Sequence, residues 1–266
     1  MEGEEGVTEP IYIGSRRELF WDDYLIDTYA STAKLKLHRL QPQEVVINHN
    51  EPWEGDGCNY HCIVKDDGLY RMYYLGWEML DANVTKHKPR PVVCYAESKD
   101  GKKWTKPQLE ICEYEGSKDN NIILDQHTDT FDNFSVFKDT HPNCPVEERY
   151  KGISLSKDGY LWCYTSADGI RFKKAWRMTN EGKFDTMNVA FWDKYKERYI
   201  CYIRDFHNVP GDDWNAGIRD IRWMVSDDFK NWTTPKLLDF DRGADFPLYT
   251  NVIQPYYRAD HMYVGF

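Results

Sequence analysis

The chain has 266 residues, 15% of them aromatic (10 Trp, 19 Tyr and 12 Phe), and its formal net charge is −10 at pH 7. This acidity counts against a protein that binds nucleic acid, because phosphate groups would be repelled and no basic stripe is visible. The sequence contains no run of 18 apolar residues, so it predicts no membrane span. The many Tyr and Trp side chains carry a large apolar area and predict an aromatic core.

The seven cysteines are odd in number and irregular in spacing. Most lie in or beside predicted strands, where a free cysteine behaves as a small buried hydrophobe. We therefore expect reduced thiols, which favour a cytoplasmic location. Residues 1–9 are acidic and lack the apolar region of a signal peptide, although an exported protein whose signal has been removed would look the same. We expect residues 1–10 to be a disordered start and 11–266 to be one domain.

The predicted elements are almost all strands. An aromatic run at 19–27 contains Asp22 and Asp23, and residues 35–40 alternate strictly, as a half-buried strand does. Further strands are predicted at 60–65, 69–75, 92–96, 134–138, 150–155, 160–165, 189–192, 199–204, 221–225, 251–257 and 262–266. An outer strand is expected from 106–109, where a proline is tolerated at a sheet edge. No long window has helical periodicity.

A motif of the form Ser-x-Asp-x-x-x-aromatic occurs three times, beginning at Ser98, Ser166 and Ser226. Ser and Asp side chains bond to backbone groups two residues further on, so each copy predicts a turn, and Asp100, Asp168 and Asp228 are interpreted as structural. The copies recur after 68 and 60 residues, following strands each time. A repeated all-β unit of four short strands is typical of a propeller blade.

The fold class predicted is therefore an all-β propeller with at least three complete blades and each turn at the same blade position. A fourth blade begins near 251 and ends in mid-strand, which predicts a chain truncated at its C-terminal side. The strands at 20–26 and 35–40 are expected to pack beside the last blade or to close the ring.

An asparagine with an upstream acid precedes each inner strand. The pairs are Asp56 and Asn59, Asp132 (or Asp129) and Asn133, Asp185 and Asn188, and Asp245 and Asn251. Inner strands line the channel of a propeller and their starts meet at one mouth, so these acids are expected to converge, within about a sugar's width, with at least one raised pKa. The alternative is that they cap the loops entering the strands.

The blade pattern Tyr-x-x-Ser-x-Asp-Gly-x-x-Trp, followed by x-x-Pro-x-Leu, resembles the five-bladed propeller glycoside hydrolases of families 32, 43 and 130. Segments at 22–25, 52–54, 70–74 and 120–124 are similar to a poorly characterised group of that superfamily. The resemblance implies one catalytic carboxylate from each of three blades, near Asp56, Asp132 and Asp185. Two departures stand out. The third acid is usually a Glu, and the Arg204-Asp205 pair, which resembles a stabiliser motif, follows a second strand.

Glycoside hydrolysis needs two carboxyl groups that flank the bond, and one of them must have a raised pKa. Aromatic neighbours such as Trp53 and Tyr60 could raise that pKa by excluding water from the carboxyl group. Glu54 and Asp22 are further candidates. The alternative for Glu54 is a solvated loop acid without a role in the site, and the alternative for Asp22 is an acid on the exposed face of an edge strand. His61 is interpreted as a satisfied polar group. The residues predicted to bind substrate are Asp22, Trp53, Glu54, Asn59, Asn133, Asn188, Arg204 and Asp205.

No His or Cys spacing predicts a metal site, and Cys58 and Cys62 would need two more ligands for zinc. A structural calcium ion in the channel is compatible with this interpretation. The expected partner is a carbohydrate, with no nucleic acid and no membrane. The oligomeric state, the sugar and the stereochemical outcome do not follow from the residues.

The function that the sequence predicts is a glycoside hydrolase or phosphorylase acting at the channel mouth. One alternative is a carbohydrate-binding propeller without catalysis. Another is a sialidase-like enzyme, because the Ser-x-Asp-x-x-x-Trp turn resembles the sialidase Asp-box. Such an enzyme needs three arginines for the substrate carboxylate, and the candidates are Arg71, Arg149, Arg177, Arg204, Arg219 and Arg222.

Overall fold

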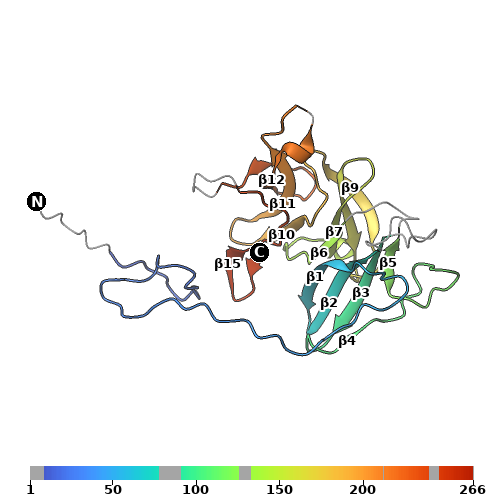
Figure 1. Ribbon diagram of the computed structural model, residues 1–266, viewed down its shortest axis with the longest axis horizontal. Coiled ribbons are helices and arrows are strands. Elements are labelled where there is room, and N and C mark those ends of the chain that lie inside the picture. Colours follow the sequence, from blue (N-terminus) through green and yellow to red (C-terminus); the bar gives the residue numbers. More distant parts are fainter. Residues whose placement is uncertain (1–8, 78–90, 126–132, 212, 240–245, 266) are drawn as a thin grey trace, which may run out of the picture. The chain divides into compact units, whose positions relative to one another are not determined.

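The computed structural model describes residues 9–77, 91–125, 133–211, 213–239 and 246–265. It divides into two compact units. Residues 1–44 and Pro255–Tyr263 make up one unit, and Val45–Gln254 with Val264–Phe266 make up the other. The second unit contains three antiparallel sheets (Figure 1).

Each sheet runs in chain order from its first strand outward. The first contains β1 (Asn59–Asp66), β2 (Leu69–Gly76), β3 (Val92–Ser98) and β4 (Trp104–Thr105), with β5 (Ile122–Asp125) also paired to β3. The second contains β6 (Ser135–Lys138), β7 (Tyr150–Leu155), β8 (Leu161–Ser166) and β9 (Lys173–Thr179). The third contains β10 (Val189–Asp193), β11 (Arg198–His207), β12 (Ile218–Ser226) and β13 (Lys236–Leu237). Two 3-10 helices, η1 (Val146–Glu148) and η2 (Trp214–Ala216), and a two-stranded sheet of β14 (Gln254–Tyr256) and β15 (Ala259–Val264) complete the described elements.

The three sheets pack face to face in chain order. One buried cluster joins Tyr73 and Tyr95 of the first sheet to Phe134 and Tyr164 of the second. A second cluster, which contains Cys163 and Cys201, joins the second sheet to the third. The innermost strands are neighbours as well, with β1 beside β6 and β6 beside β10. Meandering sheets stacked in this way are propeller blades, so the predicted all-β propeller class is confirmed for three blades.

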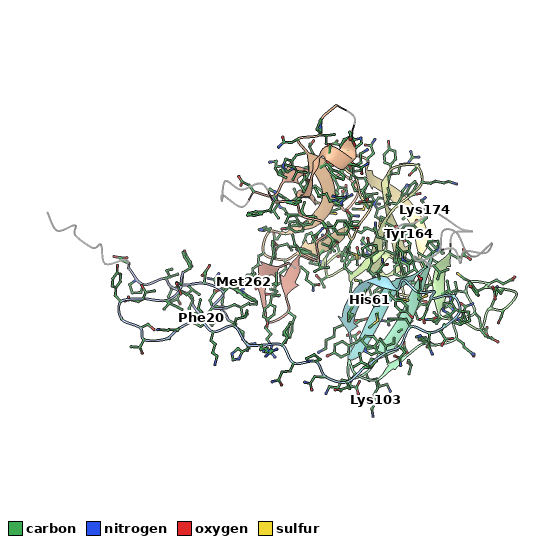
Figure 2. The ribbon with its side chains drawn as sticks, in the orientation of Figure 1. Phe20, His61, Lys103, Tyr164, Lys174 and Met262 are labelled. Carbon is green, nitrogen blue, oxygen red and sulfur yellow. The ribbon has the colours of Figure 1, made fainter. Side chains whose placement is uncertain are left out.

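The three Ser-x-Asp turns follow the third strand of each blade, as predicted. In each turn the serine Oγ lies 2.9–3.0 Å from the aspartate Oδ1, which also accepts backbone N–H bonds. Lys103, labelled in Figure 2, belongs to the first turn and donates its N–H to Asp100 at 2.8 Å. Gly101 and Gly169 have φ of +73°, whereas the third copy has Phe229 at +62°. The Phe229 side chain is fully buried in the second cluster, which offsets the strain of that conformation.

These turns give a prediction for acid stability. Burial opposes ionisation of Asp228, but bonds from the Asn231 and Lys230 N–H groups outweigh it and lower its pKa from 3.8 to about 2. A lowered pKa stabilises the fold above the unfolded-state value and loses that stabilisation as the pH falls through the folded-state value. We therefore expect Asp228→Asn, which keeps an acceptor oxygen, to flatten the fall in melting temperature as the pH decreases from about 4 to about 2. An equally steep fall in the melting temperature of the variant over this pH range would contradict this prediction.

Gly152 on β7 is required by close packing. A Cβ atom there would lie 2.3 Å from Cζ of Phe134, a ring at the centre of the first cluster. We expect Gly152→Ala to lower the free energy of unfolding by about 1–3 kcal/mol through overpacking. In a Phe134→Leu background the same change should cost much less, and urea titrations of the double-mutant cycle measure the difference. Equal costs in both backgrounds would rule out this contact as the cause.

Several predicted elements are wrong. Residues 20–26 form turns and 35–40 form no strand, and Leu37 is 98% exposed. Within its own unit the N-terminal segment contacts the hairpin through Glu18 and His261, 3.2 Å apart. Residues 106–109 are not a strand either, and the outer position of the first blade is filled by β4 and β5.

All seven cysteines are free thiols, as predicted. Within the described ranges, no helix has the length and apolar character needed to span a bilayer.

Candidate active site

The candidate site lies at one edge of the third blade. Because β10 and β11 are antiparallel, with Val189 opposite Tyr202, the end of β11 lies beside the start of β10. Arg204 and Asp205 therefore share an edge with the loop that precedes β10, although they follow a second strand. We call residues 183–188, 204–207 and 218–222 the β10 entry edge.

Asp185 and Arg204 form the centre of this edge. The Asp185 carboxylate, with a 56% exposed side chain, is ion-paired with the guanidinium of Arg204, which is 2% exposed. Arg204 also donates to the carbonyl oxygen of Lys183 at 3.3 Å, and its backbone N–H donates to Oδ1 of Asn188 at 3.1 Å. A buried, fixed cation thus holds an accessible carboxylate in place.

Asp205 points to the opposite face of β11, where it lies directly across from Asp220 of β12. Arg222 binds both carboxylates: its Nη1 is 2.9 Å from Asp205 and its Nε is 3.1 Å from Asp220. His207 Nδ1 lies 2.9 Å from the other oxygen of Asp220. Burial raises the pKa of Asp205 above 3.8, and the opposing effect of Arg222 does not cancel it. The protonated form of Asp205 is therefore favoured relative to that of a solvated aspartate.

Neighbouring segments also reach this edge. The Tyr60 hydroxyl, at the start of β1, interacts electrostatically with the Arg204 guanidinium. The carbonyl oxygen of Tyr249 accepts a bond from the Thr186 hydroxyl at 3.2 Å. The segment before β14 thus contacts the loop that precedes β10.

The asparagines before the inner strands hold the loops of this edge together. Asn133 Nδ2 donates to the Phe184 carbonyl at 2.7 Å, and Asn188 Nδ2 donates to Phe184 and Thr186. Asn251 Nδ2 donates to Met187 at 3.2 Å. Asn133 and Asn188 are fully buried. These asparagines therefore fix the loops of this edge, and their predicted role in substrate binding stays a prediction. Asn59 differs, because its Oδ1 is buried without a hydrogen-bond partner among the described residues.

The structure describes only some of the remaining predicted acids. Asp56 is exposed in the loop before β1, whereas Asp132 and Asp129 lie outside the described residues. Asp22 belongs to the other unit, where its Oδ1 accepts the Tyr24 N–H at 3.0 Å. The predicted convergence of Asp56, Asp132 and Asp185 therefore stays a prediction.

Glu54 is fully buried, so the alternative of a solvated loop acid is wrong. Its carboxylate accepts bonds from Tyr74 at 2.6 Å and Lys106 at 2.7 Å, and His49 Nδ1 lies at 3.4 Å. Burial opposes ionisation, but these partners outweigh it and lower the Glu54 pKa to about 2. A carboxylate already bonded by so many groups is suited to holding the loop before β1.

Two other residues near Glu54 form side-chain hydrogen bonds. His61 (Figure 2) has its Nε2 3.0 Å from that of His49, which agrees with its interpretation as a satisfied polar group. Trp53 Nε1 donates to Asn121 Oδ1 at 2.7 Å. Among the described residues, no group of three or more His, Cys, Asp or Glu side chains is placed to hold a metal ion.

Sequence reasoning did not identify the partners of Asp205. The sequence suggests Arg219 and Arg222 only as candidates for a sialidase arginine triad, and it does not single out Asp220, His207 or Tyr249. The available signal is the Arg-Asp-x-Arg-Trp pattern at 219–223, but the residues that these side chains face depend on the register of β11 and β12.

No protein-family model and no curated protein matches the chain. Solved structures that are similar to it include a glycosyl hydrolase from Bacteroides ovatus, at 17% identity and a TM-score of 0.41, over 75% of this chain and 53% of that one. A sucrose-6-phosphate hydrolase from Lactobacillus gasseri is 14% identical with a TM-score of 0.47, over 73% and 39% of the two chains. A family 117 glycoside hydrolase from Zobellia galactanivorans is 10% identical with a TM-score of 0.48, over 79% and 63%. The chain thus spans about two fifths to two thirds of the length of these proteins.

Proposed function

We propose that the protein is a glycoside hydrolase whose substrate binds at the β10 entry edge. The observation that carries this proposal is the Asp185 carboxylate, which is accessible and is held in place by the buried Arg204 guanidinium. Hydrolysis of a glycosidic bond needs one carboxyl group that stays protonated and one that is ionised.

In this proposal the ionised Asp185, held by Arg204, acts as the nucleophile or as the base that activates water. The proton donor to the leaving oxygen is proposed to be Asp56 or Asp132, from the first two blades. Asp205 is not assigned this role, because it lies on the opposite face of β11 from the Arg204–Asp185 pair and is bound by Arg222 at 2.9 Å. Uncleaved sugar bound at the same edge would instead indicate the carbohydrate-binding propeller. A structural calcium ion in the channel stays a proposal.

The proposal is tested by incubating the chain with a panel of aryl glycosides and plant and microbial oligosaccharides and measuring release of reducing sugar. We expect turnover of at least one class of glycoside. Binding of sugars by calorimetry without any release across the panel would favour the non-catalytic alternative.

A further inference from the structure

Arg204 and Arg219 form a pair on one face of the third blade. Arg219 lies directly across from Phe206 in the register of β11 and β12, and Arg204 is two residues before Phe206, on the same face. The Arg204 Cζ atom is 4.4 Å from the centre of the Phe206 ring and 5.8 Å from that of Tyr249. The Arg219 Cζ atom is 5.6 Å and 5.7 Å from the same two rings.

This pair has more positive charge than its neighbours neutralise. Asp185 is the one carboxylate that the structure records in an ion pair with either guanidinium, among the described residues. The nearby Arg219 contributes, after burial, to lowering the pKa of Arg204. Asp205 also acts on Arg204, but it is paired with Arg222 on the other face of β11. On the face of the arginine pair, two guanidinium groups and one carboxylate leave a net charge of about +1.

Both arginines also have unused donors. The Nε–H groups of Arg204 and Arg219 are buried and have no hydrogen-bond partner within the described part of the chain. An unpaired buried donor typically costs about 1–3 kcal/mol, so such groups call for an acceptor. The Nε–H and Nη–H groups of a guanidinium match the two oxygens of a carboxylate or of a sulfate.

We propose that Arg204 and Arg219 bind a singly charged acidic group of the sugar, a carboxylate or a sulfate ester. This inference rests on the proposed function, since it names the substrate class of the same edge. A single negative charge neutralises the site, whereas a phosphate group, with a charge of about −1.5 to −2, would leave it negative beside Asp185. The Tyr249 ring, in a side chain that is 59% exposed, is available to contact the sugar.

The test follows the arginine Nε–H signals by NMR at constant ionic strength. The probes are glucuronate, galacturonate and mannuronate, then glucose 6-sulfate, then the neutral parent sugars, with acetate and methyl sulfate as minimal anions. We expect saturable shifts of the Arg219 signal and affinity for an acidic sugar at least tenfold above that of its neutral parent. The uronate and sulfate arms identify which acidic group is bound.

Arg219→Gln should weaken binding of the acidic sugar at least tenfold and leave binding of the neutral parent unchanged. Arg198→Gln is the matched control, because it removes an exposed charge from the other end of β11. Equal losses in both variants, or no saturable shift with any acidic sugar or with acetate, would overturn the inference.

The outcomes separate this inference from the proposed function. Hydrolysis of neutral glycosides without preference for acidic sugars would leave the proposed function standing and remove the acidic subsite. Arg219-dependent binding of an acidic sugar without hydrolysis of any glycoside would do the reverse.

Discussion

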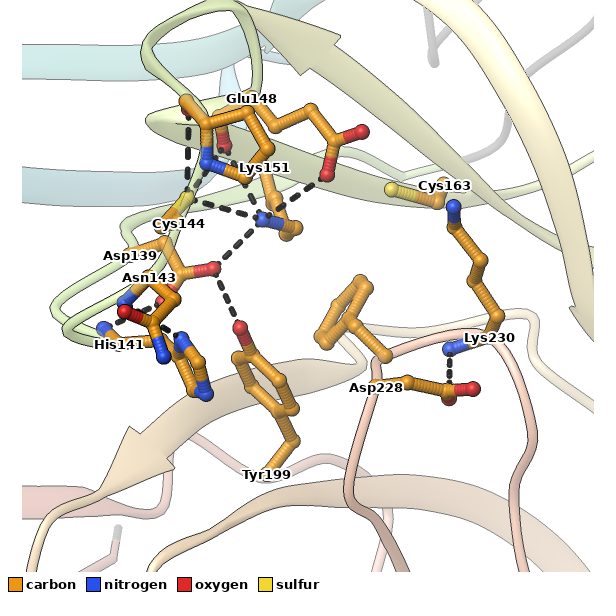
Figure 3. A network of polar contacts seen from close by, with 12 residues as sticks. Asp139, His141, Asn143, Cys144, Glu148, Lys151, Cys163, Tyr199, Asp228 and Lys230 are labelled. Atoms are coloured by element: carbon orange, nitrogen blue, oxygen red, sulfur yellow. Dashed lines mark hydrogen bonds and ion pairs between the residues drawn. The ribbon is translucent and has the colours of Figure 1, made fainter.

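Replacing Lys151 with methionine is expected to lower the free energy of unfolding by about 3–5 kcal/mol, because it leaves a buried carboxylate without its cation. Lys151 of β7 is 2% exposed, and its Nζ lies 2.5 Å from Oδ2 of Asp139, whose side chain is fully buried. The same Asp139 oxygen accepts the hydroxyl of Tyr199 at 2.8 Å (Figure 3). Tyr199 belongs to β11, so this network joins the second blade to the third.

The surroundings of Lys151 favour its charged form. Burial opposes the charge, but the hydrogen bond and attraction of Asp139 outweigh it and raise the Lys151 pKa. Lys151 also donates to the Glu148 carbonyl oxygen at 3.1 Å (Figure 3). Urea denaturation measures the loss. Lys173→Met, an exposed change on β9, should alter stability by no more than about 0.5 kcal/mol.

A double variant identifies the cause. Lys151→Met with Asp139→Asn removes both charges, and we expect it to be more stable than Lys151→Met alone. If Asp139→Asn lowered the free energy of unfolding as much in the Lys151→Met background as in the wild type, the unpaired charge would not explain the loss caused by Lys151→Met.

Replacing Asp185 with asparagine is expected to lower kcat/KM on an accepted glycoside by about 10²–10⁴-fold, the usual contribution of a catalytic acid or base. The substitution also removes the charge that pairs with the buried Arg204 guanidinium, so we expect the melting temperature to fall as well, and kcat/KM is therefore compared on the folded fraction of each variant. Asp227→Asn, an exposed acid in the turn after β12, is the control and should retain full turnover. Loss of folding without loss of turnover in the folded fraction would show that Asp185 is a loop residue.

Much of the blade structure follows from the sequence because its signals are local. Alternation and the Ser-x-Asp turns depend on neighbouring residues, and β7 was predicted at its observed bounds. Residues 35–40 alternate equally well yet form no strand, because alternation describes where side chains would point and does not supply a hydrogen-bonding partner. The outer strand β9 carries exposed lysines and was not predicted, which is common for charged edges.

The site was predictable only in part. Asp185, Arg204 and Asp205 could be picked out as chemistry-bearing residues beside strands. That Asp205 faces Asp220 depends on the register of β11 against β12, and the predicted start of β12 at 221 left Asp220 in a loop. The burial that raises the Asp205 pKa is a property of the packed blades, which no local pattern specifies.

The account is tested most directly by a crystal structure of the Asp185→Asn variant soaked with a glycoside that the wild type cleaves. The account predicts an intact sugar at the β10 entry edge, within hydrogen-bond distance of residue 185. A sugar bound elsewhere on the chain, with this edge unoccupied, would contradict it.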